Sequence, residues 1–284
     1  MICYLNGKFL PVEEATVSVM DRGFLYGDGL FETVAVYQAG LFRWDAHWLR
    51  LERGASHLGI PLPCSAIELQ DAAVQVIERN QLSNGVLRIT MTRGIGHRGY
   101  SPKGAGHPTL AITSHAGPAL EGAPLQRWSA ITSTIRLPAG GMLNSLKHTS
   151  KLPQVLARAE ADFAGADEAI LLNTSNELAE GASSNLFWIE GTTICTPPIT
   201  AGILAGVTRE FVIELCRGIG LEFKERTAPQ KALFEAEGVF VTSSGIGIAA
   251  LEKLDNRPLP TSKVTSRIYD DFCRAVTTEF GRSS

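Results

Sequence analysis

A lysine and a glutamate, separated by an apolar run, are the residues of this chain best suited to chemistry. Lys147 heads an amphipathic segment that continues to Ala161, and Glu180 follows the apolar residues 169–172. A primary amine forms a Schiff base with an aldehyde, and a carboxylate facing a ring nitrogen keeps that nitrogen protonated. The pair therefore predicts a site for pyridoxal phosphate, with the lysine at the head of that amphipathic segment.

Such a cofactor needs anion-binding groups, and Arg50 is the first candidate. It lies in the sequence His-Trp-Leu-Arg-Leu of a helix predicted over residues 45–60, with Asp45 as its cap. An arginine among apolar neighbours is either a surface charge extending past the core or a fixed fork for an anion.

Two glycine-rich segments near the C-terminus are further candidates. The run 202–209 includes Val207 and Thr208 and directly precedes a helix predicted over 210–217. Thr208 is there either a simple N-cap or a phosphate ligand, because free N–H groups and the helix dipole face an anion. The apolar strand from Gly238 ends in hydroxyls and glycine that also suit a phosphate, namely Ser243, Ser244 and Gly245.

Two glycine-containing segments near the N-terminus could meet a substrate. Residues 26–33 form a tight turn or a loop that brings Phe31 or Glu32 to a pocket, and no helix follows as in a nucleotide loop. Residues 93–102 combine three glycines with two arginines, a histidine and a tyrosine. This composition is typical of a surface loop or of a mobile cationic loop for a carboxylate-bearing substrate.

Strands alternate with helices along the chain, which predicts an α/β (α+β) fold. Asn6-Gly7 indicates a hairpin, residues 16–20 alternate like a strand, and Ser65 with Glu68 forms a capping box for a helix over 65–80. A last helix is predicted over 264–280. The Gly- and Pro-containing residues 117–124 predict a linker between an N-terminal domain, 1–116, and a C-terminal domain, 125–284.

Composition bears on the partners and the cellular compartment of the protein. The chain has 284 residues, 44% hydrophobic and 19% charged, with a net charge of −3. This balance gives no pull toward nucleic acid or anionic membranes, and no apolar run reaches the ~18 residues of a membrane span. The N-terminus lacks a signal-peptide pattern. Five scattered cysteines without a CxxC pair predict free thiols in a reducing cytoplasm and no metal site.

Together these segments resemble the class IV (fold type IV) aminotransferase and lyase family of pyridoxal phosphate enzymes, over nearly the whole chain. The matching motifs are His-x-x-Arg-Leu, Glu-x-x-x-x-Asn from Glu180 to Asn185, and Gly-Ile-x-x-Gly-x-Thr-Arg. The resemblance implies a small N-terminal α/β domain, a larger C-terminal domain of pseudo-barrel type with the cofactor between them, and a homodimer. It implies that Lys147 is catalytic and holds the cofactor together with a set of other residues: Arg50, Glu180, Val207, Thr208, Ser243, Ser244 and Gly245.

Within the family, the segments 26–33, 93–102 and Leu146-Lys147-His148 are similar to 4-amino-4-deoxychorismate lyase, which forms 4-aminobenzoate and pyruvate for folate synthesis. This likeness implies a substrate pocket that contains Phe31, Thr33, Arg98 and Lys151. Lyases of this type usually carry Leu-Asn-Arg-Leu after Lys-His, whereas this chain has Thr149-Ser150-Lys151-Leu152. An aminotransferase acting on D-amino acids or branched-chain L-amino acids with 2-oxoglutarate is the alternative, since both reactions begin with the same proton abstraction. A non-catalytic cofactor-binding protein is disfavoured by the intact Lys147, Glu180 and Arg50.

Overall fold

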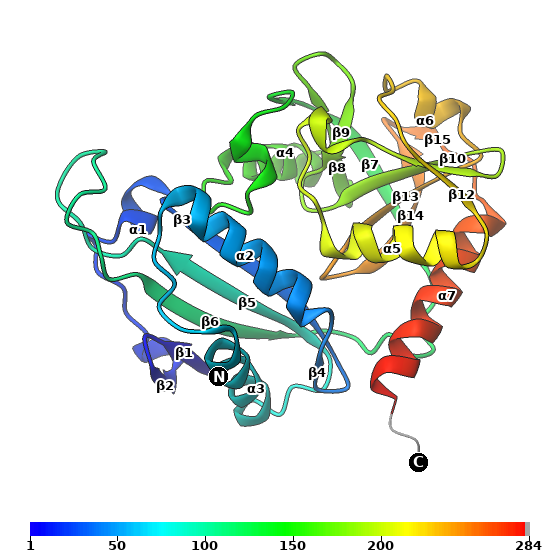
Figure 1. Ribbon diagram of the computed structural model, residues 1–284. Helices are drawn as coiled ribbons and strands as arrows, with labels where there is room; N and C mark the ends of the chain where they lie inside the picture. The colour runs from blue at the N-terminus through cyan, green and yellow to red at the C-terminus, as the bar shows by residue number, and fades with distance from the viewer. Residues whose placement is uncertain (282–284) are drawn as a thin grey trace. The chain divides into compact units, whose positions relative to one another are not determined.

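A computed structural model describes residues 1–281, so the last three residues of the predicted C-terminal domain lie outside the described part. The chain forms two compact units (Figure 1). The first comprises Met1–Gly122 together with Leu146–Ser150 and residues 280–281; the second comprises Ala123–Ser145 and Lys151–Glu279. By its contacts Lys147 therefore belongs to the first unit, although it follows the linker in the sequence.

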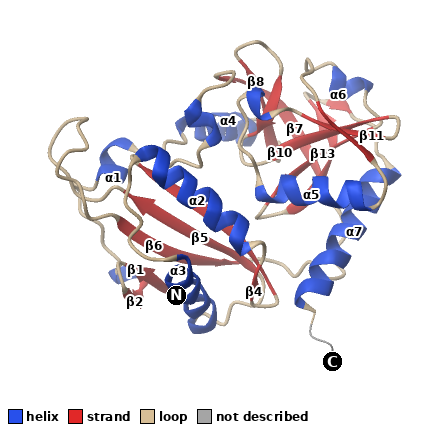
Figure 2. Cartoon of the chain, in the orientation of Figure 1, coloured by secondary structure: helices blue, strands red, loops and turns tan. Residues whose placement is uncertain are grey.

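The first unit consists of one antiparallel sheet and helices packed on it (Figure 2). The strand order is β2-β1-β6-β5-β3-β4. The bounds of its strands and helices are β1 Ile2–Leu5, β2 Lys8–Pro11, the 3-10 turn Val12–Glu14, α1 Arg22–Tyr26, β3 Gly29–Tyr37, β4 Gly40–Leu41, α2 Trp44–Leu58, α3 Ala66–Arg79, β5 Gly85–Thr92 and β6 Thr109–Ala116.

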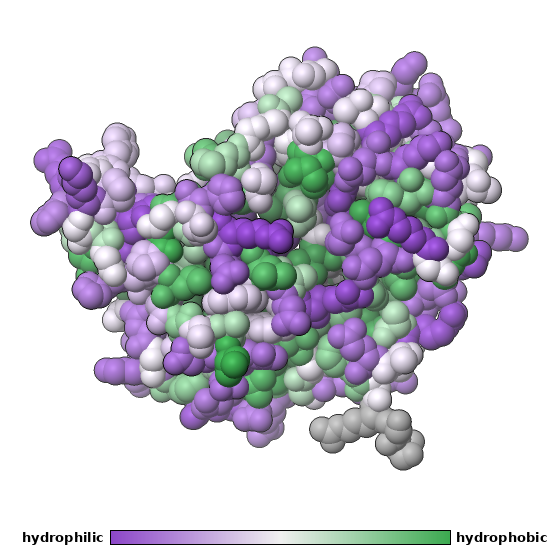
Figure 3. All heavy atoms as spheres, in the orientation of Figure 1, coloured by the Kyte–Doolittle hydropathy of each residue, from purple (hydrophilic) through white to green (hydrophobic). Residues whose placement is uncertain are grey.

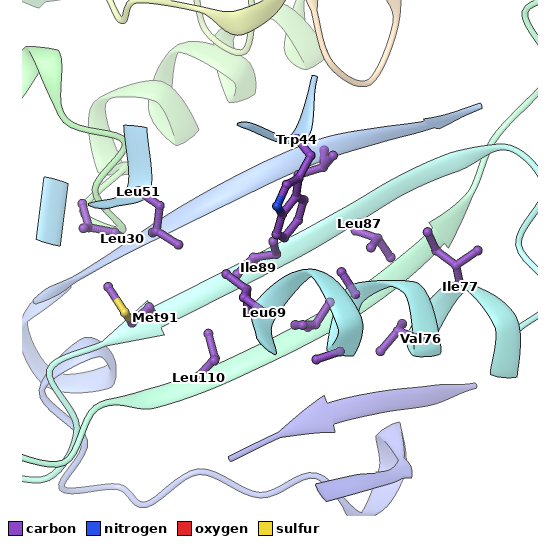
Figure 4. Close-up of a cluster of buried hydrophobic side chains, with 14 of the residues drawn as sticks. Leu30, Trp44, Leu51, Leu69, Val76, Ile77, Leu87, Ile89, Met91 and Leu110 are labelled. Atoms are coloured by element: carbon purple, nitrogen blue, oxygen red, sulfur yellow. The ribbon is translucent and has the colours of Figure 1, made fainter. Parts of the chain in front are cut away.

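The core of this unit lies between the sheet and the helices α2 and α3. Figure 4 shows Leu30, Leu87 and Ile89 of the strands pointing into the same layer as Leu69 and Val76 of α3. Alternate residues of a strand face opposite sides of the sheet, so residues 30, 32, 34 and 36 of β3 face the helices. Residues 31 and 33 face the other side, and this alternation separates the two groups of polar side chains described below.

Of three local structures predicted from sequence in this unit, one is confirmed and two are wrong. The capping box of α3 is confirmed, with Ser65 and Glu68 each bonding the other's backbone. Asp45 is not the cap of α2: Arg43 precedes the helix without a side-chain cap bond, and Asp45 lies in the first turn. Residues 16–20 do not form a strand, and Val19 is 70% exposed. Alternation there lacks a neighbouring strand to pair with.

The second unit is built on a closed sheet. Its elements are β7 Gln126–Leu137, the 3-10 turn Met142–Ser145, α4 Leu152–Phe163, β8 Glu168–Asn173, β9 Leu178–Gly181, β10 Asn185–Glu190, β11 Thr193–Thr196, the 3-10 turn Ile199–Ala201, α5 Val207–Gly218, β12 Glu222–Glu225, α6 Ala232–Glu235, β13 Gly238–Ser243, β14 Gly247–Leu254, β15 Arg257–Pro258 and α7 Lys263–Phe280.

Six of these strands close into a barrel. The order β10-β13-β14-β7-β8-β9 returns to β10 through the pairing of Glu180 in β9 with Asn185 in β10. Closure of a sheet leaves no free strand edge at that point. The mixed α/β architecture with a barrel-like sheet confirms the predicted fold class, and two residues of the predicted cofactor motif make the closing contact.

Two helices start elsewhere than the sequence indicated. Helix α4 begins at Leu152, so Lys147 lies in an extended segment before it and not on the helix. Pro153 is tolerated in the first turn, because an N–H there has no partner within the helix in any case. Helix α5 begins at Val207 with Gly206 as its N-cap, so Thr208 is a residue of the first turn rather than the cap.

No helix within residues 1–281 is both long and apolar enough to span a membrane. The face drawn in Figure 3 mixes hydrophilic and hydrophobic side chains.

Candidate active site

Lys147 is held beside β3 by backbone hydrogen bonds. The N–H of Phe31 donates to the Lys147 carbonyl at 2.9 Å, and the N–H of Thr149 donates to the Gly29 carbonyl at 2.9 Å. A bridge pairs Leu30 with His148. The half-buried Lys147 side chain places Nζ 4.7 Å from the centre of the Phe31 ring. The backbone of the candidate Schiff-base lysine is thus fixed as if it were an additional strand.

A buried charged cluster on the helix side of the sheet contains Arg50. The guanidinium donates to Glu32 through Nε at 2.8 Å and Nη2 at 2.7 Å, and His47 Nδ1 lies 2.7 Å from the same carboxylate. Glu32 and His47 are each 1% exposed. Burial alone would raise the pKa of Glu32, but Arg50 and His47 outweigh it and hold that pKa at about 2.

The same cluster keeps His47 neutral near pH 7. Burial lowers its pKa, and the charges of Arg50 and Lys147 lower it further, although Glu32 acts in the opposite direction. Sequence reasoning identified Arg50, considered Glu32 only as a residue that a loop could bring to a pocket, and assigned no role to His47. The signal was the spacing of His47 and Arg50, three apart on one helix face, facing an acidic residue in an apolar strand.

Arg88 on β5 is a second residue that the sequence reasoning missed. Its guanidinium carbon lies 4.0 Å from the centre of the Phe31 ring, so this ring has both Arg88 and Lys147 close to it. The residue is exposed, although partial desolvation of the guanidinium lowers the pKa of Arg88. In the β3–β5 register Arg88 is opposite Thr33, on the face of the sheet away from the helices. A charged residue between the apolar Leu87 and Ile89 of a predicted strand was the available signal.

The cationic loop 93–102 is held by hydrogen bonds from two arginines. Arg22, 4% exposed, donates to the carbonyls of Gly99 at 2.9 Å, Tyr100 at 3.0 Å and Ser101 at 3.1 Å. Arg93 is occupied by Asp28, with Nε donating to the carboxylate at 2.8 Å. These contacts hold the loop in place, whereas its composition alone predicted a mobile segment.

For the other candidate substrate residues, the structure gives their exposure and their unit but no contact that defines a role. Arg98 is an exposed residue of the loop, and Thr33 is half-buried on β3. Lys151 is half-buried, and its carbonyl accepts the N–H of Val155 at the start of α4 at 2.9 Å. Arg98 and Thr33 belong to the first unit and Lys151 to the second.

In the second unit, Glu180 is oriented by the backbone. The N–H of Leu204 donates to Glu180 Oε2 at 2.9 Å, while Asn185 Nδ2 donates to the Leu204 carbonyl at 2.9 Å and contacts Glu180 Oε2 at 3.4 Å. A carboxylate that accepts a backbone N–H is favoured in its ionised form. The Glu-x-x-x-x-Asn motif is therefore a strand pair in which the asparagine ties the glutamate to the loop before α5.

Glu168 stabilises the turn that joins these two strands. It is fully buried, and its Oε2 accepts the hydroxyls of Ser183 at 3.1 Å and Ser184 at 2.8 Å, in the turn between β9 and β10. The structure gives this carboxylate a positioning role that the sequence did not signal, since Glu168 follows an aspartate in a segment that reads as a strand start.

The N-terminus of α5 has the features of an anion site. Its N-cap is Gly206, and no side chain within residues 1–281 caps it. A Cβ at Gly206 would lie 1.9 Å from Asn185 Oδ1, so only glycine fits there. Val207 and Thr208 are buried in the first turn, where backbone N–H groups and the helix dipole favour a negative charge. Ser243 ends β13, followed by the half-buried Ser244 and the exposed Gly245.

Each unit carries its own set of polar groups. The first offers a primary amine, which can form a Schiff base with an aldehyde, and a guanidinium. The second offers an oriented carboxylate, which suits a ring nitrogen, together with an uncapped helix N-terminus and two serine hydroxyls, which suit a phosphate.

Comparison with known proteins identifies the family of this chain. The family model for class IV amino-transferases matches residues 29–254. A putative branched-chain-amino-acid aminotransferase from Methanocaldococcus jannaschii is 34% identical over 285 residues, covering 99% of this chain and 98% of that protein. An aminodeoxychorismate lyase from Bacillus subtilis is 33% identical over 255 residues, covering 89% and 86%. The structure of a branched-chain amino acid aminotransferase from T.th. with pyridoxamine 5'-phosphate matches with a TM-score of 0.91 at 29% identity, covering 98% and 96%. The chain therefore belongs to the class IV aminotransferase family of pyridoxal phosphate enzymes.

Proposed function

We propose that Lys147 carries the pyridoxal phosphate of this enzyme and that Glu180 faces its ring nitrogen. Arg50, the first turn of α5 at Val207 and Thr208, and the residues Ser243, Ser244 and Gly245 take the phosphate in this proposal. The uncapped start of α5 supports it, because the N–H groups there need an acceptor and the dipole favours an anion.

Each residue then has a defined task. The bound cofactor supplies an aldehyde for the substrate amine and a protonated ring that withdraws electrons from the carbon bearing that nitrogen. The released Lys147 amine takes the proton from this carbon as general base. Glu180, held by the Leu204 N–H, keeps its negative charge in position, and Arg50 is oriented by Glu32.

For the reaction, we propose the lyase activity that converts 4-amino-4-deoxychorismate into 4-aminobenzoate and pyruvate. The observation that carries this proposal is Arg88, whose guanidinium lies 4.0 Å from the Phe31 ring that Lys147 Nζ also approaches. A cation beside the reacting lysine suits a cyclic substrate with carboxylates.

The test is a comparison of substrates with one enzyme preparation. Purified protein is given 4-amino-4-deoxychorismate, and separately D-alanine or L-leucine with 2-oxoglutarate. The expected result is 4-aminobenzoate and pyruvate in equal amounts from the first, and no sustained glutamate from the others. Lys147→Ala is the inactive control, and Arg88→Met is expected to raise KM for the lyase substrate about tenfold.

The aminotransferase reaction is the second candidate. It is favoured by the Methanocaldococcus jannaschii relative, which covers nearly the whole chain, and by the structural likeness to the branched-chain aminotransferase from T.th.. In that reaction Lys147 would move the same proton, but no enolpyruvyl group would leave. Steady glutamate formation without 4-aminobenzoate would establish this activity and reject the lyase proposal.

We also propose that the enzyme acts as a homodimer in the cytoplasm, in folate synthesis. Exposed apolar side chains of the first unit, with Val19 at 70% and Phe24 at 75% exposure, support self-association. Five free cysteines support a reducing compartment. Sedimentation equilibrium that yields only the monomer mass would reject the dimer.

A further inference from the structure

The two residues after Lys147-His148 that depart from the usual lyase sequence have a defined place in the first unit. Thr149 Oγ1 donates to the Gly27 carbonyl at 2.8 Å. Ser150 Oγ donates to the same carbonyl at 3.1 Å and lies 3.4 Å from the Tyr26 carbonyl. We refer to these hydroxyl contacts of Thr149 and Ser150 on Tyr26 and Gly27 as the Gly27 clasp.

The clasp depends on Gly27 being a glycine. Its φ of +65° is in the left-handed region, where it ends α1, and a Cβ there would lie 2.2 Å from Ser150 Oγ. The missing side chain lets the Ser150 hydroxyl approach the backbone closely. Together with the Thr149 N–H to Gly29 bond, the clasp ties the two residues at positions 149 and 150, just after Lys147-His148, to the turn before β3 and to its first residue.

The same turn anchors the cationic loop. Asp28, next to Gly27, accepts Arg22 Nε at 2.8 Å and Arg93 Nε at 2.8 Å, which hold its pKa below the ordinary value. The other nitrogens of Arg22 bind the carbonyls of residues 99–101, directly after Arg98. The Lys147 segment and the loop therefore have one common attachment.

We propose that Thr149 and Ser150 are positioning residues for Lys147, and that the turn of Gly27 and Asp28 fixes Lys147 relative to the Arg98 loop. Their hydroxyls bind backbone carbonyls, so they act on the placement of the lysine rather than on the substrate. This inference rests on the proposed role of Lys147 but not on which of the two reactions the enzyme performs.

The test compares Thr149→Val/Ser150→Ala, which removes both hydroxyls, with Ser145→Ala. Ser145, in the 3-10 turn directly before this segment, is the control, because its hydroxyl donates to the local Met142 carbonyl at 2.7 Å. Thr149→Val alone serves if the double variant does not fold, and Thr149→Ser restores the donor. All variants are measured without cofactor and with it.

In the cofactor-free protein, amide hydrogen exchange of the peptide over residues 146–152 is expected to become about tenfold faster in the double variant. A peptide over β5 should be unchanged. With cofactor bound, kcat is expected to fall about 10- to 100-fold with little change in KM. The pH midpoint of the cofactor's visible absorbance should shift, since it depends on the environment of the Lys147 nitrogen.

Exchange, kcat and pH midpoint equal to those of Ser145→Ala would overturn the proposal, and so would a Thr149→Ser variant that behaves like Thr149→Val. A different failure would concern the proposed function: wild-type protein that binds pyridoxal phosphate without a Lys147-dependent absorbance. In that case the exchange measurement still decides whether the clasp fixes the segment.

Discussion

Replacement of Glu32 by glutamine tests the buried cluster that orients Arg50. Lowering a carboxyl pKa from 4.5 to about 2 corresponds to about 3 kcal/mol of preference for the ionised form in the folded protein. The amide keeps the shape of the side chain but removes the charge between Arg50 and His47. Removing one partner of a buried ion pair costs ~3–5 kcal/mol when the other charge stays unpaired. We expect Glu32→Gln to lower the free energy of unfolding by about 3 kcal/mol at pH 7.

The pH dependence gives the sharper test. The depressed pKa means that the contribution of Glu32 is fully present above the unfolded-state value of 4.5 and is lost as pH falls toward 2. The stability difference between wild type and Glu32→Gln should therefore be about 1 kcal/mol smaller at pH 4 than at pH 7. Glu52→Gln, an exposed carboxylate on the same helix, is the matched control.

The assay is urea unfolding of the cofactor-free protein, followed by circular dichroism and by fluorescence of the tryptophans, two of which, Trp44 and Trp48, lie on α2. A variant as stable as wild type at pH 7 would refute the assignment of Glu32 as an ionised partner of Arg50. A stability difference that stays constant between pH 7 and pH 4 would contradict the depressed pKa.

Three further changes probe other contacts. Arg22→Met removes the donors to the carbonyls of residues 99–101. In steady-state kinetics, KM for a carboxylate-bearing substrate should rise about tenfold, while kcat changes less. An unchanged KM would show that the loop does not take part in substrate binding. Gly206→Ala places a Cβ 1.9 Å from Asn185 Oδ1 and should weaken cofactor binding about tenfold in a titration, whereas Gly218→Ala, with open space around it, should not. Burial raises the pKa of Cys216 to about 12, so mass spectrometry should find this thiol unmodified by an alkylating reagent at pH 8 unless urea is added; rapid labelling of the native protein would contradict its burial.

The sequence predicted features that depend on local physics. The capping box at Ser65 and Glu68 forms as expected because both partners lie within one turn. The apolar run 169–172 is fully buried in β8, as four consecutive apolar residues between polar ones indicate. The pairing of Glu180 with Asn185, by contrast, is a finding of the structure, because the sequence marked the two residues only as parts of one motif.

Features that depend on distant contacts could not be predicted in this way. Lys147 belongs to the first unit because its segment bonds β3, more than a hundred residues earlier in the chain. The register that places Arg88 opposite Thr33 is set by the pairing of two whole strands. Likewise, the close approach of Asn185, which leaves room only for glycine at the N-cap of α5, depends on a residue about twenty positions earlier in the chain.

The contacts of the Lys147 segment bear on which residues could determine whether the enzyme is a lyase or an aminotransferase. Thr149 and Ser150 differ from the usual lyase sequence, but their hydroxyls bind the backbone carbonyls of Gly27 and Tyr26. A backbone carbonyl carries no information about the substrate, so this departure does not argue against the lyase. Near Lys147, the side chains of Phe31 and Arg88 lie on the face of the sheet away from α2 and α3. We therefore expect substrate selection by charge to respond to changes at Arg88 and not to changes at Thr149 or Ser150.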